Sequence, residues 1–484
     1  MAPSHPFGWT NLLGWLLVVA AATASRAWYL LRFTDAGLAE PPPVQVQDPS
    51  PRLALPPGTR MHGQDPPTEL DALIHNLKEH RWFGSLPPFA AGEERTAHTS
   101  PGYPWLRARL ELLAEPLLGE TVSVDQVQRW LHVALGALTA GFCFLLAQRM
   151  FRHTLVGVLS GLAAAVYPFW ILNTAELNDG VWATFLLMAV VWLGCRGAAE
   201  GGAVTSLVFG FSLAALALVR APLLPFAVVA LLWYLAQARH VPRGWLAAIL
   251  AFLGFVNGLG YWVVRNYQAF GDFVPVVDSA YYHLWVGNNS HAHGGPVSED
   301  SLMAVLTEVK AADFPDASRE EIRRWVQLQT RAERVRLYGE MFWSELRQHP
   351  GAFWRRRLEA AAAFLLGRQW ALDGKLWRGD FAATEPVWWR ECFAGCLYAS
   401  VFGLLALGLL GWRWSYPWRA EAMPATLALV WLPLPYVLSH AEMLSGPRLP
   451  WDGVLLCHAA FALAAMLPGI GPPSRSDPED HPGN

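Results

Sequence analysis

The sequence predicts an all-α, polytopic membrane protein with about ten transmembrane helices and two long outer loops that carry amphipathic helices. Composition is the first reason: 53% of the 484 residues are hydrophobic and only 15% are charged, whereas soluble domains carry roughly 25% charged residues. The second reason is a series of apolar runs, many of which approach the ~20 residues that a span requires. The third is the set of 25 tryptophans, which cluster near the ends of these runs as an aromatic belt does.

Ten apolar segments are the predicted spans. They cover residues 9–31, 127–148, 154–173, 180–195, 203–219, 222–236, 244–264, 392–412, 423–440 and 451–468. The first segment contains Ala22-Thr23-Ala24, which resembles a signal-peptide cleavage site. No basic region precedes it, however, and the apolar run continues to Leu31, so we interpret it as a span.

Basic residues in the short loops predict the orientation. Those that fall on one side are Arg149, Arg152, Arg196, Arg239, Arg243, Arg413 and Arg419. Cytoplasmic loops are enriched in Lys and Arg, so this side is assigned to the cytoplasm, together with both termini. The long segments, about 32–126 and 265–391, then face the periplasm or the outside of the cell (inner) membrane. Residues 1–470 are predicted as one transmembrane domain, and the tail 471–484, rich in Pro, Ser and acid, as disordered.

Both long outer loops contain predicted helices. In the first loop a helix begins near Thr68, and leucines and an isoleucine over residues 70–77 form its apolar face. In the second loop Ser318 and Glu321 form a capping-box pattern before a long amphipathic helix that extends to Leu346. With many arginines opposite its apolar side, this helix is expected to lie along the membrane surface. The run Arg355-Arg356-Arg357 is expected to anchor the loop to lipid headgroups.

Several classes of function are disfavoured. A net charge of -3 argues against a nucleic-acid partner. The sequence has no Gly-rich phosphate loop, GxSxG, HExxH or paired CxxC motif. The five cysteines lie in or beside apolar runs and are interpreted as small core residues. His291 and His293 lie in a Gly-rich loop without nearby carboxylates, so we expect neither a metal nor another cofactor.

Acidic residues near the ends of spans are the first candidates for function. Asp65 lies in the first outer loop, and Glu176 and Asp179 occupy the short outer turn between the third and fourth spans. Ionisable groups close to the hydrocarbon region are costly and often functional. The alternative is that each carboxylate is simply solvated in its loop.

Three arginines on the predicted outer face are the second set of candidates. Arg220 lies in a tight turn before Ala221-Pro222, Arg265 follows an aromatic and β-branched run, and Arg448 lies in the last outer loop. Guanidinium groups bind phosphate through two parallel hydrogen bonds, so three of them could hold a lipid-linked phosphate in one cavity. The alternative is that each side chain extends separately to the membrane interface.

These segments resemble the GT-C glycosyltransferases, in particular the bacterial relatives of dolichyl-phosphate-mannose protein mannosyltransferases and lipid A aminoarabinose transferases. The stretches that carry the resemblance, in chain order, are Leu73-Ile74-His75-Asn76-Leu77, Pro101-Gly102-Tyr103-Pro104, Trp262-Val263-Val264-Arg265-Asn266-Tyr267, Gly271-Asp272-Phe273-Val274-Pro275, Gly287-Asn288-Asn289, His349-Pro350 and Pro447-Arg448-Leu449-Pro450. Together they run in order through nearly the whole chain.

The resemblance implies a GT-C fold and a polyprenyl-phosphate sugar donor bound at the outer leaflet of the bilayer. It implies that Asp65 acts as general base on the acceptor, with Asp179 and then Glu176 orienting the acceptor or the base. Arg220, Arg265, Asn266, Tyr267 and Arg448 would bind substrate. No nucleotide sugar and no metal would be required; protein partners, the sugar and the acceptor are not indicated.

The sequence departs from the family in three places: at the first-loop Asp–Tyr pair, before Pro101, where Thr99-Ser100 replaces an Arg, and at the start of the fourth span, where Asn178-Asp179 replaces Thr-Glu. The family has an Asp shortly before a Tyr at the start of the first-loop helix, and alignment through Leu73 places Pro66 and Leu70 at these positions. A catalytically silent subunit with the same fold, used for binding or assembly, is therefore the alternative. A secondary transporter is less favoured, because the spans show no inverted repeat.

Overall fold

The computed structural model consists of α-helices and confirms the predicted all-α class. It describes residues 8–33, 69–85, 94–118, 123–240, 244–295, 299–310, 318–366, 387–415, 422–440 and 446–467. Within these ranges the β-structure is one antiparallel pair of two-residue strands, β1 (Gly84–Ser85) and β2 (Glu94–Arg95). The predicted tail 471–484 lies outside the described residues.

Six helices are long and apolar enough to cross a membrane. They are α1 (Trp9–Phe33), α4 (Val124–Phe151), α7 (Gly180–Glu200), α9 (Leu224–Ala238) with the 3-10 turn η2 (Ala221–Leu223) before it, α10 (Gly244–Phe270) and α17 (Val387–Trp414). The other four predicted spans correspond to shorter apolar helices. These are α5 (Thr154–Val166) followed by α6 (Pro168–Asn173), α8 (Ala203–Val219), α18 (Met423–Trp431) followed by α19 (Pro433–Leu438), and α20 (Leu449–Ala465).

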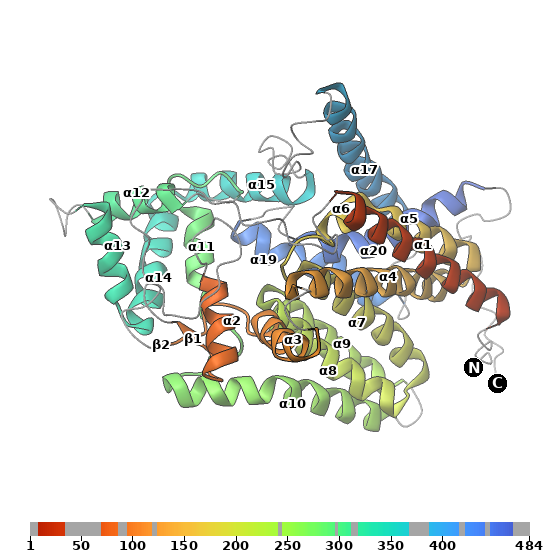
Figure 1. The fold of residues 1–484 in the computed structure, drawn as a ribbon, viewed down its shortest axis with the longest axis horizontal. Helices are drawn as coiled ribbons and strands as arrows, with labels where there is room; N and C mark the ends of the chain where they lie inside the picture. The colour runs from red at the N-terminus through yellow and green to blue at the C-terminus, as the bar shows by residue number, and fades with distance from the viewer. Residues whose placement is uncertain are drawn as a thin grey trace.

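Helix α20 lies in the middle of the bundle, where it packs against α4, α5, α7 and α17 (Figure 1). Nearly all of its side chains are buried, as expected for a helix that is apolar on every side. Glycines let α17 come close to it. A Cβ atom at Gly411 would lie 1.9 Å from the carbonyl oxygen of His458, so this contact between two membrane helices requires the smallest residue.

The long loops form a second group of helices at one end of the bundle. They are α2 (Glu69–Glu79), α3 (Gly102–Leu118), α11 (Ala280–Asn288), α12 (Glu299–Lys310), α13 (Arg319–Leu328), α14 (Arg331–Gln348) and α15 (Pro350–Leu366). Figure 1 shows α11 to α14 gathered away from α1, α4 and α5. We call the end that carries these helices the long-loop side. The group has a core of its own, to which Trp285, Leu306, Ile322 and Phe342 belong.

The amphipathic segment after Ser318 differs from the prediction in two ways. It forms two helices rather than one, because Gln329 is extended and Thr330 starts α14 with a second capping box to Glu333. Its apolar side also packs against protein, since Ile322 and Phe342 are buried in the core of the long-loop group. The expected position along the membrane surface is therefore wrong for these apolar residues.

The predicted headgroup anchor at residues 355–357 is also corrected. Arg355 is exposed, but Arg356 and Arg357 are buried. Arg357 donates to the carbonyl oxygens of Gly287, Val437 and Ser439, which ties the end of α11 to the end of α19. Two of the three arginines therefore hold protein segments together.

Candidate functional site

The centre of the candidate site is an ion pair between Asp179 and Arg220. Asp179 lies at the start of α7 and Arg220 at the end of α8, so the helix termini bring together residues that are far apart in sequence. Arg220 donates from Nε to Asp179 Oδ2 at 2.7 Å and from Nη2 to Oδ1 at 2.5 Å. Its Nη1 donates to the carbonyl oxygen of Gly446 at 2.5 Å. The Arg220 side chain is 7% exposed and that of Asp179 is 26% exposed.

Turn residues next to Asp179 and Arg220 hold the two side chains in place. Asn178 Oδ1 accepts a hydrogen bond from the backbone N–H of Gly180 at 2.8 Å, which shapes the turn before α7. Gly446 has φ +94°, a conformation that side chains disfavour. A Cβ atom at Gly446 would lie 3.2 Å from Arg220 Nη2 and 3.1 Å from Gly180 Cα. Glycine at this position therefore lets the backbone just before α20 lie against the ion pair.

The Pro101-Gly102-Tyr103-Pro104 segment docks on the same turn. Ser100 Oγ accepts a hydrogen bond at 2.9 Å from the backbone N–H of Ala221, the residue after Arg220. A Cβ atom at Gly102 would lie 2.7 Å from the backbone nitrogen of Val219. The glycine of this motif therefore permits the close approach of α3 to the end of α8.

Tyr103 is held beside this site by a polar network. Gln128 donates to the Tyr103 hydroxyl at 2.8 Å and accepts from Arg107 at 2.6 Å. Arg107 also forms ion pairs with Asp125 and Glu111. Burial raises the pKa of Tyr103 to about 12, and the charge of Asp179 contributes to the increase. The hydroxyl therefore keeps its proton at neutral pH and can act as a hydrogen-bond donor.

Arg448 belongs to a different pair. It is fully buried at the start of α20, where Nε donates to Asp452 Oδ1 at 2.7 Å. Asp452 Oδ2 accepts from the hydroxyl of Tyr167 at 2.7 Å, and Arg448 Nη1 donates to the carbonyl oxygen of Leu365. Arg448 thus connects α20 to α15 and, through Asp452, to the break between α5 and α6.

Arg265, Asn266 and Tyr267 lie within α10, because that helix continues past the predicted boundary at 264 to Phe270. Arg265 donates to the carbonyl oxygens of Phe83 and Thr96, and its guanidinium lies 4.8 Å from the centre of the Trp262 ring.

The two neighbours of Arg265 differ in exposure. Asn266 is buried and donates to the carbonyl oxygen of Val274 at 2.9 Å, whereas Tyr267 is exposed. Arg265 and Asn266 therefore organise the first loop and the turn after α10. The three predicted arginines have three separate sets of protein partners.

The predicted acidic residues are placed as follows. Asp179 pairs with Arg220, and Glu176 lies half-buried in the turn between α6 and α7. Asp65 lies outside the described residues. Within the residues that the structure describes, no group of three or more His, Cys, Asp or Glu side chains is placed to hold a metal ion.

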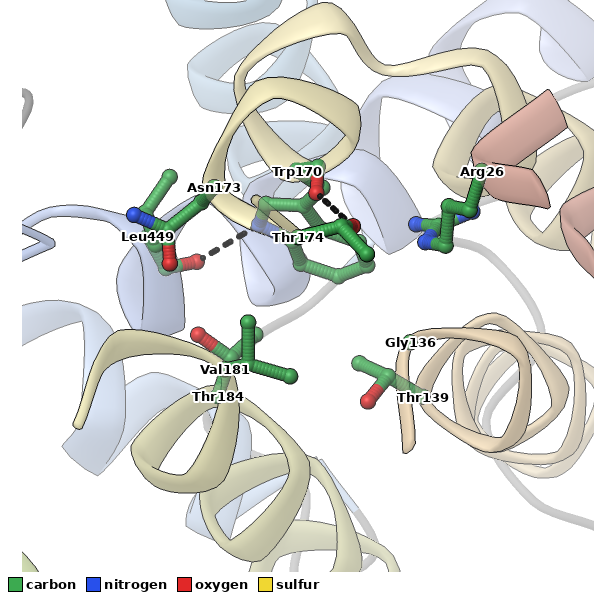
Figure 2. A pocket seen from close by; sticks show the side chains of 9 residues that line it. All are labelled: Arg26, Gly136, Thr139, Trp170, Asn173, Thr174, Val181, Thr184 and Leu449. Atoms are coloured by element: carbon green, nitrogen blue, oxygen red, sulfur yellow. Dashed lines mark hydrogen bonds between the residues drawn. The ribbon is translucent and has the colours of Figure 1, made fainter. Parts of the chain in front are cut away.

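Two sets of polar residues near these segments were not predicted. The Gln128–Arg107 network has no motif of its own, although Tyr103 is part of the segment that carries the family resemblance. The other is Arg26 in α1, which is fully buried and lines a small cavity together with Asn173 (Figure 2). The signal for Arg26 was a single charged residue inside an apolar run.

No family model and no curated protein matches the chain. Among solved structures, the chain is similar to the archaeal oligosaccharyltransferase AglB from Archaeoglobus fulgidus, in complex with an inhibitory peptide and a dolichol-phosphate. That alignment has 12% identity and a TM-score of 0.49, and it covers 95% of this chain and 51% of the other. The apo form of the Archaeoglobus fulgidus oligosaccharyltransferase gives 11% identity and a TM-score of 0.47, with 96% and 51% covered. The chain therefore spans about half the length of these proteins.

Proposed function

We propose that this protein is a GT-C-type membrane glycosyltransferase that moves a sugar from a polyprenyl-phosphate donor to an acceptor on the outer face of the cell membrane. The observation that carries the proposal is the meeting of four separate segments around Asp179 and Arg220. These are the turn before α7, the end of α8, the Pro101–Pro104 segment and the loop at Gly446. Two of the four carry the sequence resemblance to the family.

Arg220 is the proposed phosphate ligand. A guanidinium has five N–H donors. Three of them donate to Asp179 and Gly446, and the Tyr436 side chain interacts with the same guanidinium, so a phosphate would replace some of these contacts. Charge-assisted hydrogen bonds to phosphate oxygens are among the strong ones in proteins. The protonated Tyr103 hydroxyl supplies a further donor nearby. These groups would stabilise the negative charge that develops on the departing phosphate.

Asp179 is proposed to position Arg220 and to orient the acceptor, with Glu176 as a second residue of the same turn. Both Asp179 oxygens accept hydrogen bonds from Arg220, which makes this carboxylate a poor general base. We therefore propose Asp65 for that role, because it is the acidic residue next to Pro66, which aligns with the family's Asp. A general base must come within roughly 2.6–3.2 Å of the acceptor hydroxyl, directly or through one water.

The test is transfer of radiolabelled sugar from a polyprenyl phosphate by membranes that contain the protein. We expect activity to persist in EDTA, to be lost in Asp65→Asn and to fall in Arg220→Gln. The exposed Tyr261→Phe, at a residue of α10 that belongs to no predicted site, serves as the control for expression and handling. Full activity in Asp65→Asn would remove Asp65 as the base. Full activity in Arg220→Gln would contradict the phosphate site.

A catalytically silent subunit is the second candidate function. The observation that favours it is that Asp179, the described carboxylate at the centre of the site, is already neutralised by an arginine. A silent subunit would retain a polyprenyl phosphate, detected by mass spectrometry of co-purifying lipid, and would transfer no sugar from any donor. Arg220→Gln would then reduce lipid retention alone.

The proposed orientation has an independent test. Single cysteines would be placed at Asp272, on the long-loop side after α10, and at Arg239, after α9, in a cysteine-free background. Both residues are exposed. An impermeant thiol reagent applied to intact cells should label the cysteine at position 272 and not the one at position 239. The reverse pattern would put the site in the cytoplasm and exclude an outer-face acceptor.

A further inference from the structure

Helix α3 lies beside the ends of two apolar helices, α4 and α8, on the long-loop side. Gly102 brings its first turn against the backbone of Val219, which ends α8. Arg107 pairs with Asp125 in the first turn of α4. In Figure 1, α4 and α10 run across the picture, whereas α3 is seen closer to end-on. Helix α3 therefore crosses the direction of the spans at the level where they end.

The two sides of α3 have different surroundings. Tyr103, Ala108 and Ala114 are buried on the side that packs against α2, α4 and α8. The opposite side is exposed and consists of Trp105, Arg109, Leu112, Leu113, Pro116 and Leu117. Residues at these intervals share one face of a helix, and Leu113 and Leu117 are 64% and 80% exposed. We call this exposed set the α3 strip.

Two tryptophans mark the level of the α3 strip relative to the bilayer. Trp105 lies in the first turn of α3, and Trp130 lies shortly after Asp125, the α4 residue that pairs with α3. Both indole side chains are partly exposed, at 49% and 41%. Tryptophan is enriched where a membrane helix leaves the hydrocarbon region. The α3 strip therefore lies at the boundary between membrane and water, next to a span.

Arg109 places a positive charge within the α3 strip. Its guanidinium carbon lies 5.4 Å from the centre of the Trp105 ring. The neighbouring Arg107 is neutralised by Asp125 and Glu111, whereas Arg109 forms no ion pair with a described residue. The stem of an arginine can lie on apolar surface while its charge reaches the headgroup level. There a free guanidinium can donate to the phosphate oxygens of lipids.

We propose that α3 is an interfacial helix: the α3 strip inserts into the leaflet on the long-loop side, and Arg109 binds the phosphate groups of anionic phospholipids. Helices that lie in the interface combine leucine and tryptophan with cations in this way. Lipid is favoured over a protein partner because the strip lies at the end of a span, near the exposed Trp130.

This contact bears on the candidate site because α3 also carries Tyr103. A leaflet that holds the α3 strip keeps the Tyr103 hydroxyl at a fixed level beside Arg220. The phospholipids involved are distinct from the polyprenyl-phosphate donor, so the inference does not depend on the transferase activity.

The experiment is spin labelling of the full-length protein in nanodiscs that contain phosphatidylglycerol. Nitroxides are attached to Leu113→Cys, Leu117→Cys and the control Arg336→Cys, each in a cysteine-free background; the side chain of Arg336 is 80% exposed on α14. We expect both α3 labels to collide with oxygen, which concentrates in the bilayer, and to be protected from a water-soluble nickel chelate. The label at position 336 should show the opposite pattern.

Two outcomes overturn the insertion of the α3 strip. Access of the nickel chelate to both α3 labels would place the strip in water. Protection from oxygen and from the chelate together would mean that protein covers the strip. Spectral broadening between labels on two molecules would then identify a second copy of the chain as the occupant.

Arg109→Gln tests the headgroup contact. Replacing phosphatidylcholine by phosphatidylglycerol in the nanodiscs should raise the melting temperature of the unmodified protein, because anionic lipids attract cations at the membrane surface. We expect a smaller rise in Arg109→Gln and an unchanged rise in Arg336→Gln, the matched control on α14. No rise in the unmodified protein, or equal rises in all three proteins, overturns the contact between Arg109 and lipid phosphate.

Discussion

Two arginine–aspartate pairs in this protein have the same chemistry and different surroundings. Arg448 and Asp452 are four residues apart on α20, and both side chains are 0% exposed. Arg220 and Asp179 join two different helices, and the side chain of Asp179 is 26% exposed to solvent. In the first pair Tyr167 also donates to Asp452 and Arg448 to the carbonyl oxygen of Leu365, while Arg448 Nη2 is buried without an acceptor among the described residues.

The difference indicates separate roles. A sealed pair cannot exchange partners with a substrate, because separating the charges would leave both without water. The Arg220–Asp179 pair borders on solvent. A phosphate could therefore replace part of its contacts at a lower cost in free energy than at the Arg448–Asp452 pair. We therefore infer that Arg448–Asp452 stabilises the helix bundle and that Arg220–Asp179 is the functional pair.

The largest effect is expected from Asp452→Asn. The change leaves the Arg448 charge buried without a counter-ion, which costs about 3–5 kcal/mol of unfolding free energy. Denaturant or thermal unfolding in lipid measures it. The double variant Arg448→Met/Asp452→Asn removes both charges and should recover much of the loss. If Asp452→Asn were as stable as the unmodified protein, the Arg448–Asp452 pair would not stabilise the fold.

Arg357→Gln extends the comparison to a buried arginine that binds only carbonyl groups. Hydrogen bonds to a charged group contribute about 1.5–3 kcal/mol, and we expect the free energy of unfolding to fall by an amount in this range. Arg355→Gln is the matched control, since its side chain is 72% exposed and should change stability by no more than about 0.5 kcal/mol. Equal effects of the two substitutions would restore the headgroup-anchor interpretation of this segment.

Asp179→Asn should separate activity from stability. Because water can reach the site, we expect a loss of about 1–2 kcal/mol in unfolding free energy, smaller than that of Asp452→Asn. Sugar transfer should nevertheless fall at least about tenfold, since Arg220 loses its orientation; tenfold corresponds to about 1.4 kcal/mol in the barrier. Unchanged transfer with a large loss of stability would reverse the roles of the two pairs.

The last prediction concerns how the stability of the protein depends on pH, through a buried histidine on the long-loop side. Burial, with smaller contributions from His440 and His98, lowers the pKa of His283 to about 3. His283 Nδ1 and His440 Nε2 lie 3.2 Å apart and join α11 to the segment after α19. The unfolded chain binds a proton near pH 6.5, whereas the folded chain does so only near pH 3, so stability decreases as pH falls through this window.

The slope should be roughly 1 kcal/mol per pH unit below 6.5. His283→Gln should make the dependence of melting temperature on pH between 7 and 5 shallower, while His440, whose pKa is also lowered by burial, retains part of it. The exposed His240→Gln should leave the dependence unchanged. An identical slope in His283→Gln and the unmodified protein would show that this histidine is not the titrating group.

Two helix boundaries in the structure differ from those predicted from the sequence. The predicted seventh span ends at residue 264, one residue before Arg265, whereas α10 continues to Phe270. The charge is accommodated because carbonyl groups of the first loop accept its hydrogen bonds and aromatic rings cover it. The break between α13 and α14 could have been found, since Thr330 and Glu333 repeat the capping-box spacing of Ser318 and Glu321.

The sequence by itself determined the class of this protein, because hydropathy is a local property: each apolar run must leave water whatever its neighbours are. It also identified Asp179 and Arg220 as candidates, because charges at the ends of spans are costly. Only the tertiary structure decided that these two form one ion pair, that Arg448 pairs with Asp452, and that Arg265 holds the first loop. A guanidinium can donate to a carboxylate, a carbonyl or a phosphate, and which of these acceptors lies within 3 Å depends on how the helices pack.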